Sequence, residues 1–174
     1  MLTRVAAGEV DFGIGPERAT STEIAAQPLF EMPFMVVFPQ GHALEALPRI
    51  CWSDVVQHPF IALQGQFTER LALDLHVSLQ KLTLHPSNEV AFMTTALSMV
   101  SARLGITACL PYATSLVQLH HLQMRPLHEP ELRRTFQVYM RSNTSPSPAA
   151  AKFMEFLFAY VASHGWNAPQ EPAA

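Results

Sequence analysis

The segment from Gly13 to Arg18 carries groups that could bind a small anion. Gly13 and Gly15 would let a ligand approach the backbone, Pro16 belongs to a turn signature, and the planar guanidinium of Arg18 can pair with a carboxylate. The segment lacks the third glycine of a dinucleotide-binding fingerprint, so we expect no dinucleotide cofactor. The alternative for Arg18 is a solvated charge on a loop.

A second polar segment links an expected strand to an expected helix and consists of Gln64, Gly65, Gln66, Phe67 and Thr68. Its amides and hydroxyl would lie just ahead of a helix N-terminus, where backbone N–H groups attract anions. In the alternative, Thr68 only caps the helix and Phe67 only packs beneath it. Asn88 is a third candidate, at the expected start of the next helix, where it is either a ligand contact or a cap and nothing more.

Other chemistries find little support in the residue pattern. The densest histidines are His120, His121 and His128, and their spacing is neither helical i, i+4 nor combined with cysteines, so we expect no metal and no other cofactor. No Gly-x-Ser-x-Gly elbow is present for a catalytic triad. Cys51 and Cys109 are the only cysteines, and we expect buried thiols in a reducing cytoplasm, with a disulfide between them left open.

The elements that would position these residues begin with a helix end followed by a strand. Leu2, Val5 and Ala6 have helical spacing, Gly8 is a helix stop, and Val10–Ile14 has strand composition. A helix this short is not stable alone, so we expect the chain to start in the middle of a fold. The apolar run from Pro33 to Pro39 predicts a strand that is central in a parallel sheet, because both its faces are apolar.

The other expected elements alternate between strands and helices, which indicates an α/β fold with mostly parallel sheets. Ser53 or its neighbour would cap a helical turn, Gly105 would end a helix that starts near Val90, and Ser147 would cap the last helix. The expected strands are 59–63, 82–84, 106–110, 122–127 and 135–140, and the expected helices are 52–56, about 68–79, 90–103 and about 148–161. The last of these helices has an apolar stripe of Phe153, Phe156, Leu157, Tyr160 and Val161. Residues 168–174 would be a disordered tail.

Composition narrows the class of protein. The chain has 174 residues, 49% of them hydrophobic and 14% charged, which is typical of a packed globular protein. The net charge is −3, from 11 basic and 14 acidic residues, and the basic ones are scattered, so we expect no nucleic-acid surface on this chain. No apolar run is long enough for a membrane anchor and no signal peptide is recognisable, so we expect a cytoplasmic protein.

Five short sequence segments, called stations below, resemble the effector-binding domain of LysR-type transcriptional regulators by their order along the chain. They cover the chain from Val5 to about Val161, and only their order and spacing together make the resemblance specific. The stations are residues 8–14; 28–30 with 36–44; 52–55 with 59–61; 99–106 with 110–111; and 147–150 with Phe153, Phe156 and Leu157. Arg103 departs from the pattern, because the family more often has glycine there.

The resemblance implies a two-lobed fold like that of type II periplasmic binding proteins, with the first lobe incomplete. The first lobe would take residues 1–34 and 135–174 and the second lobe residues 35–134. The DNA-binding helix-turn-helix and the first strand of the first lobe would lie upstream of this chain. A small, anionic effector would bind between the lobes, partly to the loop from Gln64 to Thr68, and the full-length protein would form a homodimer or a larger homo-oligomer.

The sequence therefore predicts a ligand-sensing domain of a bacterial transcription regulator rather than an enzyme. A solute-binding protein for uptake shares the expected fold and is the main alternative; it predicts an export signal where a regulator has its helix-turn-helix. An enzyme on the same scaffold has less support, because no acid and base pair stands at a recognisable spacing.

Overall fold

The computed structural model describes residues 1–65, 71 and 84–164, and their contacts divide the chain into two compact units. Unit 1 consists of Met1–Met32 and the chain from Arg133 through the last helix; unit 2 consists of Pro33–Leu132. Each unit contains its own sheet and helices, so the expected α/β class is confirmed. The helix expected after Thr68, the beginning of the strand expected at 82–84 and the tail 168–174 fall outside the described residues.

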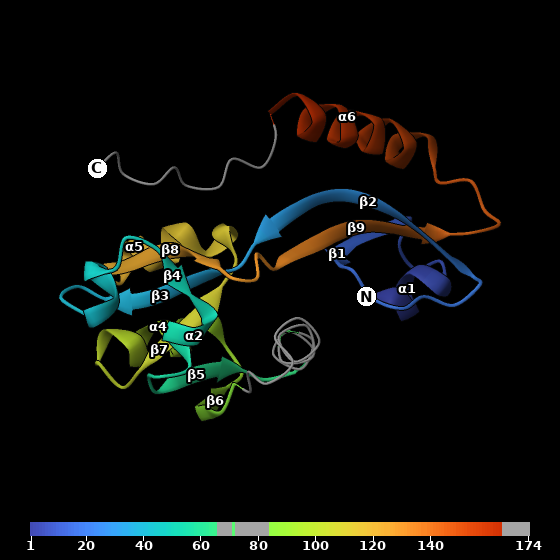
Figure 1. Cartoon of the computed structure of the whole chain (residues 1–174). Coiled ribbons are helices and arrows are strands. Elements are labelled where there is room, and N and C mark those ends of the chain that lie inside the picture. The colour runs from blue at the N-terminus through green and yellow to red at the C-terminus, as the bar shows by residue number, and fades with distance from the viewer. Residues whose placement is uncertain (66–70, 72–83, 165–174) are drawn as a thin grey trace. The chain divides into compact units, whose positions relative to one another are not determined.

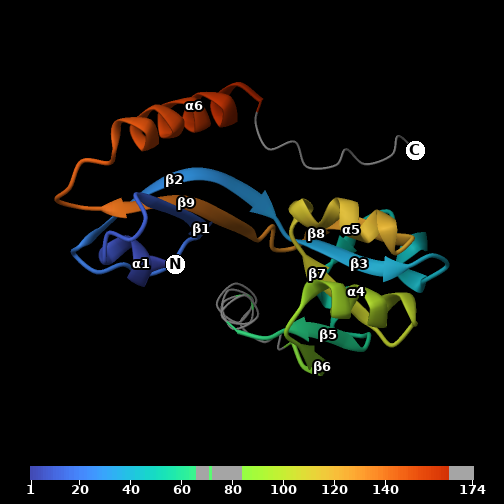
Figure 2. The same cartoon turned by 180° about the vertical axis from the view of Figure 1, so that it is seen from behind.

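Unit 1 is a three-stranded sheet between two helices. Its sheet has the order β1-β9-β2, and Figures 1 and 2 show α1 and α6 on opposite faces of it. The core of the unit contains Val5, Ile24 and Tyr139. The elements are α1 (Leu2–Ala6), β1 (Phe12–Pro16), β2 (Ile24–Pro33), β9 (Arg133–Arg141) and α6 (Pro148–His164).

Two helix boundaries in unit 1, the end of α1 and the start of α6, lie where the sequence predicts them. Gly8 has a φ of 71° and its N–H bonds to the Val5 carbonyl at 3.0 Å, which ends α1. The Ser147 hydroxyl oxygen accepts the Ala150 N–H at 3.3 Å and caps α6, and Pro148 is the first residue of the helix. Both predictions are confirmed.

The apolar stripe of α6, which its spacing would place in the core, is only partly buried. Ala150 and Met154 are buried, whereas Phe153, Phe156 and Tyr160 are 50%, 64% and 51% exposed. Phe153 still stacks on Phe12 of β1, with ring centroids 5.7 Å apart. The three-stranded sheet therefore leaves several aromatic side chains of the stripe exposed.

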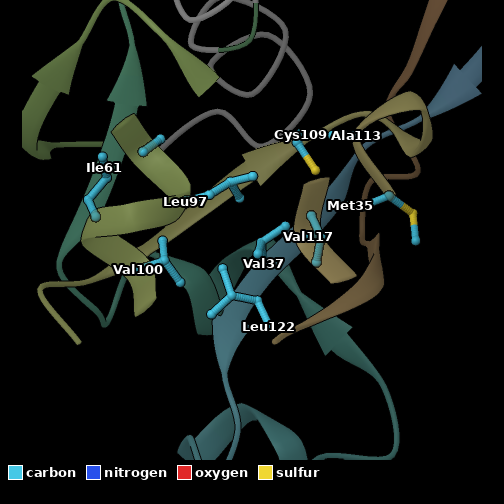
Figure 3. Close-up of a cluster of buried hydrophobic side chains, with 10 residues drawn as sticks. Met35, Val37, Ile61, Leu97, Val100, Cys109, Ala113, Val117 and Leu122 are labelled. Atoms are coloured by element: carbon cyan, nitrogen blue, oxygen red, sulfur yellow. The ribbon is translucent and has the colours of Figure 1, made fainter. Parts of the chain in front are cut away.

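Unit 2 contains a six-stranded sheet of order β4-β8-β3-β7-β5-β6. A cluster that includes Met35, Val37, Leu97 and Val100 packs between this sheet and two helices, α4 and α5 (Figure 3). The strands are β3 (Met35–Pro39), β4 (Ile50–Cys51), β5 (Phe60–Leu63), β6 (Pro86–Val90), β7 (Ile106–Cys109) and β8 (Leu122–His128), and the helices are η1 (Ala43–Ala46), α2 (Trp52–Val55), α4 (Met93–Ser101), η2 (Pro111–Ala113) and α5 (Thr114–Leu119).

The direction of β3 differs from the expected one. All five residues of β3 are buried and the strand is central, as its apolar run predicts, but it runs antiparallel to both neighbours, β7 and β8. The pairs β4–β8, β5–β7 and β5–β6 are parallel, so the larger sheet is mostly parallel around one reversed strand. In unit 1, β1 and β9 are antiparallel.

Three element boundaries also differ from expectation. Residues 86–90 form β6, so Asn88 lies in a strand and not at a helix start, and α4 begins at Met93. The N-cap of α2 is Cys51, whose N–H donates to the Asp54 carboxylate at 2.8 Å, and not Ser53. β6 is an edge strand that pairs through its backbone, which allows its Ser-Asn-Glu composition.

Arg103, rather than Gly105, ends α4. Arg103 has a φ of 60°, its N–H bonds to the Val100 carbonyl at 2.9 Å, and the Leu104 N–H bonds to the Met99 carbonyl at 3.0 Å, a Schellman motif. The turn therefore keeps the shape that glycine favours in spite of the arginine. Gly105 has another role: a Cβ there would lie 2.5 Å from the Pro59 carbonyl oxygen.

The described residues show neither a cysteine bridge nor a membrane span. Cys51 and Cys109 are free thiols; Cys109 is buried as expected, whereas Cys51 at the start of α2 is only half-buried. Burial raises the pKa of Cys109 to about 12. Of the helices among the described residues, none is both long and apolar enough to cross a membrane.

Candidate functional site

The loop from Gly15 to Arg18 leaves β1 at the edge of the unit 1 sheet. Gly15 and Pro16 pair with Gln137 and Phe136 of β9, and the Glu17 N–H continues the pairing to the Thr135 carbonyl at 2.8 Å. Arg18 follows immediately and its side chain is exposed. The expected candidates Gly15, Pro16 and Arg18 are thus held on a backbone that β9 fixes.

The two glycines of this segment adjoin a side chain of the chain itself. A Cβ at Gly13 would lie 2.7 Å from the Met1 sulfur, and one at Gly15 would lie 3.1 Å from the Met1 methyl carbon. Their lack of side chains therefore makes room for Met1 in this structure.

Tyr139 of β9 is hydrogen-bonded to the loop, a role that the sequence did not predict. Its side chain is fully buried, and its hydroxyl donates to the Pro16 carbonyl at 2.7 Å and accepts the Arg18 N–H at 3.1 Å. Burial raises the pKa of Tyr139, while the Arg18 N–H and guanidinium act in the opposite direction. The alternating pattern of β9 predicts an inward side chain at this position, but nothing local predicts partners about 120 residues away.

In unit 2, the candidates Gln64 and Gly65 lie at the carboxyl end of β5. The Gln64 N–H donates to the Val90 carbonyl at the end of β6 at 2.8 Å, which joins the ends of two parallel strands. Gly65 has a φ of 87°, no atom of the described residues lies within 4 Å of where its Cβ would be, and both residues are exposed. The carboxyl edge of parallel strands is where open α/β sheets bind ligands. Gln66, Phe67 and Thr68 lie outside the described residues.

Asn88 is exposed on β6, in the strand that Gln64 joins. Its side-chain amide donates to the Ser87 hydroxyl at 3.4 Å, and that hydroxyl donates to the Phe60 carbonyl at 3.0 Å. The amide therefore takes part in a contact between β6 and β5 instead of capping a helix.

Two exposed aromatic residues at the same sheet edge were missed by sequence reasoning. Phe92 follows β6 and is 70% exposed, and Tyr112 follows β7 and is 51% exposed. Burial of the Tyr112 hydroxyl end raises its pKa, and the Cys109 thiol adds to the rise. Both residues follow strands that are parallel to each other, and this position would indicate a ligand-binding edge. The sequence alone does not give the direction of each strand, so it could not reveal this position.

Two basic side chains of unit 2, near β4 and β8, have structural partners. Arg125 donates to the Leu47 and Pro48 carbonyls at 2.7 and 2.9 Å, and Arg49 pairs with Glu129 and Glu131 at 3.8 Å. Within the described residues no group of three or more histidine, cysteine or acidic side chains is arranged to hold a metal ion.

Residues 1–162 match the family model described as the LysR substrate binding domain. A relative from Escherichia coli (strain K12), the uncharacterized HTH-type transcriptional regulator YbhD, is 29% identical over 156 residues, which cover 90% of this chain and 49% of that protein. The chain thus spans about half the length of this curated relative.

Solved structures show the same fold. The BenM effector binding domain with its effector benzoate is 21% identical, with a TM-score of 0.82, and the match covers 98% of this chain and 79% of that one. The effector binding domain of QuiR in complex with shikimate is 20% identical, with a TM-score of 0.78, and the match covers 94% and 77%. At these identities the likeness establishes the fold alone.

Proposed function

The chain belongs to the LysR substrate-binding domain family, and from this membership we propose that it is the effector-sensing domain of a bacterial LysR-type transcription regulator. The observation that carries the proposal is the match of the family model from residue 1 to residue 162, which includes both units. A relative with a helix-turn-helix name, about twice as long as the matched part, supports a regulatory role for the whole protein. In that protein the sensing domain would relay effector binding to a DNA-binding module.

The proposed effector is a small anion, a carboxylate in the first instance. Two structural neighbours, one solved with its effector benzoate and one in complex with shikimate, support this class. In this chain Arg18 is an exposed guanidinium on a fixed loop, and Gln64 and Gly65 present backbone and amide groups at the carboxyl edge of β5. We retain Gly15, Pro16, Arg18, Gln64, Gly65, Gln66, Phe67, Thr68 and Asn88 as the proposed contacts.

The remaining parts of the proposal concern the whole protein. It would act in the cytoplasm, as a homodimer or a larger homo-oligomer, and would release its effector unchanged rather than convert it. Recovery of unaltered ligand after incubation with purified protein tests the last point, and turnover of the ligand would contradict it.

The coding sequence upstream of this chain distinguishes a regulatory function from a function in solute uptake. A regulator requires a helix-turn-helix module there, whereas a solute-binding protein requires an export signal. Sequencing the complete reading frame therefore tests the proposal. A helix-turn-helix supports it, and a signal peptide would overturn it.

A further inference from the structure

A pocket of about 630 Å³ in unit 1 has no role in the function proposed above. It lies between α6 and the strands β2 and β9, in the part of the unit where both strands meet the boundary with unit 2. Its lining residues are Leu29, Phe30, Glu31, Arg133, Phe158, Val161 and Ala162. The volume falls within the range of small-molecule sites, which is roughly 300–1,000 Å³.

The walls of this pocket are apolar and held in place. The Phe30 ring stacks on Phe136 of the neighbouring strand, with centroids 5.1 Å apart and an interplanar angle of 24°. Phe158 and Val161 contribute apolar surface from one face of α6. An apolar body in the pocket would contact the Phe30 ring and the side chains of Phe158 and Val161.

The charged residues of the pocket lining are Glu31 and Arg133, which form an ion pair. Arg133 contacts the Glu31 carboxylate through Nε at 3.4 Å, and the other Glu31 oxygen accepts the Thr135 hydroxyl at 3.2 Å. A guanidinium has five N–H donors, and this ion pair uses one of them. Since Arg133 and Glu31 are 50% and 55% exposed, Arg133 can turn its terminal nitrogens toward a second carboxylate at low cost.

We propose that this pocket binds a small amphipathic carboxylate, with its apolar body between Phe30 and Phe158 and its carboxylate on Arg133. The site belongs to unit 1 alone and shares no residue with the proposed effector contacts. It is therefore a second site, which can be tested separately from the first.

The test uses 2-naphthoate as a fluorescent probe and 2-naphthylmethanol as its neutral analogue, titrated into the purified 174-residue chain. We expect saturable binding of the carboxylate and at least about tenfold weaker binding of the alcohol, because only the carboxylate gains a charge-assisted hydrogen bond. Arg133→Met should remove this preference. Glu31→Gln should strengthen naphthoate binding, since it removes a competing carboxylate.

Two tryptophan variants locate the bound probe. Ala162→Trp fills the pocket from an exposed position and should abolish naphthoate binding. Ala149→Trp, an exposed alanine at the other end of α6 and outside the pocket, should leave it unchanged. Thermal unfolding of both variants checks that they fold.

The inference fails if the chain does not bind naphthoate at millimolar concentration, if the alcohol binds equally well, or if Ala162→Trp binds like wild type. Arg18→Ala should not alter naphthoate binding at this pocket. If binding depends on Arg18 and not on Arg133, the probe occupies the proposed effector site, which supports the proposed function and overturns the second site.

Discussion

Tyr139 is the residue on which the geometry of the Gly15–Arg18 loop depends most directly. Its hydroxyl joins the Pro16 carbonyl to the Arg18 N–H, so Tyr139→Phe removes one acceptor and one donor while keeping the buried ring. We expect the Arg18 amide to exchange its hydrogen about tenfold faster, because its protection depends on local opening of this bond. Amide exchange measured by NMR tests this.

The neighbouring amide is an internal control for this prediction. Glu17 donates to the Thr135 carbonyl and not to Tyr139, so its exchange should change little in Tyr139→Phe. Equal acceleration at both amides would mean that the substitution loosens the whole strand and that the hydroxyl has no specific role in the loop.

Gly105 is required for close backbone contact. A methyl group there would lie 2.5 Å from the Pro59 carbonyl oxygen, whereas one at Gly41 would meet nothing within 4 Å. We expect Gly105→Ala to lower the free energy of unfolding by about 3 kcal/mol and Gly41→Ala, which has only the strain of its positive φ, by about 1 kcal/mol. Urea unfolding measures both, and equal losses would contradict the steric explanation.

His42 should make stability depend on pH. Its Nδ1 accepts the Leu44 N–H at 3.2 Å, and its ring contacts His58 with centroids 4.6 Å apart. Burial, then the charges of His58 and Arg103, lower the pKa of His42 below its usual 6.5. The unfolded chain therefore takes up this proton first, so the stability contributed by neutral His42 is present above pH 6.5 and is lost as the pH falls through the folded pKa.

A variant that cannot titrate isolates this effect. Asparagine also caps helices, so His42→Asn should show a smaller loss of the free energy of unfolding than wild type between pH 6.5 and about pH 5. A steeper acid loss in His42→Asn would be the opposite of this expectation.

The sequence predicts the role of a residue that acts on nearby backbone groups, but not the role of a residue whose partners are distant in the chain. Gly8 and Ser147 act on backbone groups within four residues, so their roles follow from position alone. Asp11 and Tyr139 bond to residues more than 120 positions away, and their roles appear only when the fold brings the segments together.

At the level of elements, α6 is attached to the sheet through its cap. The Asp11 carboxylate accepts both the Ser147 N–H and its hydroxyl, at 3.0 and 3.1 Å. We expect Ser147→Ala to cost about 1 kcal/mol of the free energy of unfolding, and Ser147→Ala with Asp11→Ala to cost less than the sum of the single changes, since both disrupt one network. Ser145→Ala, in the exposed loop before the helix, is the control. Additive losses in urea unfolding would show that the two residues act independently.

Strand existence was more predictable than strand direction. The apolar run of β3 indicated burial on both faces, which is correct, but burial does not determine whether a strand is parallel to its neighbours. β6 was missed because its side chains are polar and it pairs by backbone at an edge. For the same reason Asn88 was expected at a helix start.

At the scale of the whole molecule, the chain crosses between the units twice, at Met32–Pro33 and at Leu132–Arg133. Within unit 2 the two crossing segments are joined, because the Phe34 N–H donates to the Leu132 carbonyl at 3.1 Å. The order of stations along the sequence predicted this family, whereas single residues could not identify the ligand.

The most direct test of the sensing role is thermal unfolding of the purified 174-residue chain with small carboxylates, benzoate and shikimate among them. A ligand at 100 times its Kd should stabilise the folded chain by about 2.7 kcal/mol and raise Tm by roughly 7 °C. In the Arg133→Met background, which removes the carboxylate contact of the proposed second site, Arg18→Ala should remove this shift, while Arg4→Ala, an exposed cation of the same unit, should retain it. If no carboxylate raises Tm, or if the shift is the same in Arg18→Ala, the account of this chain as an anion-sensing domain with Arg18 in its site is contradicted.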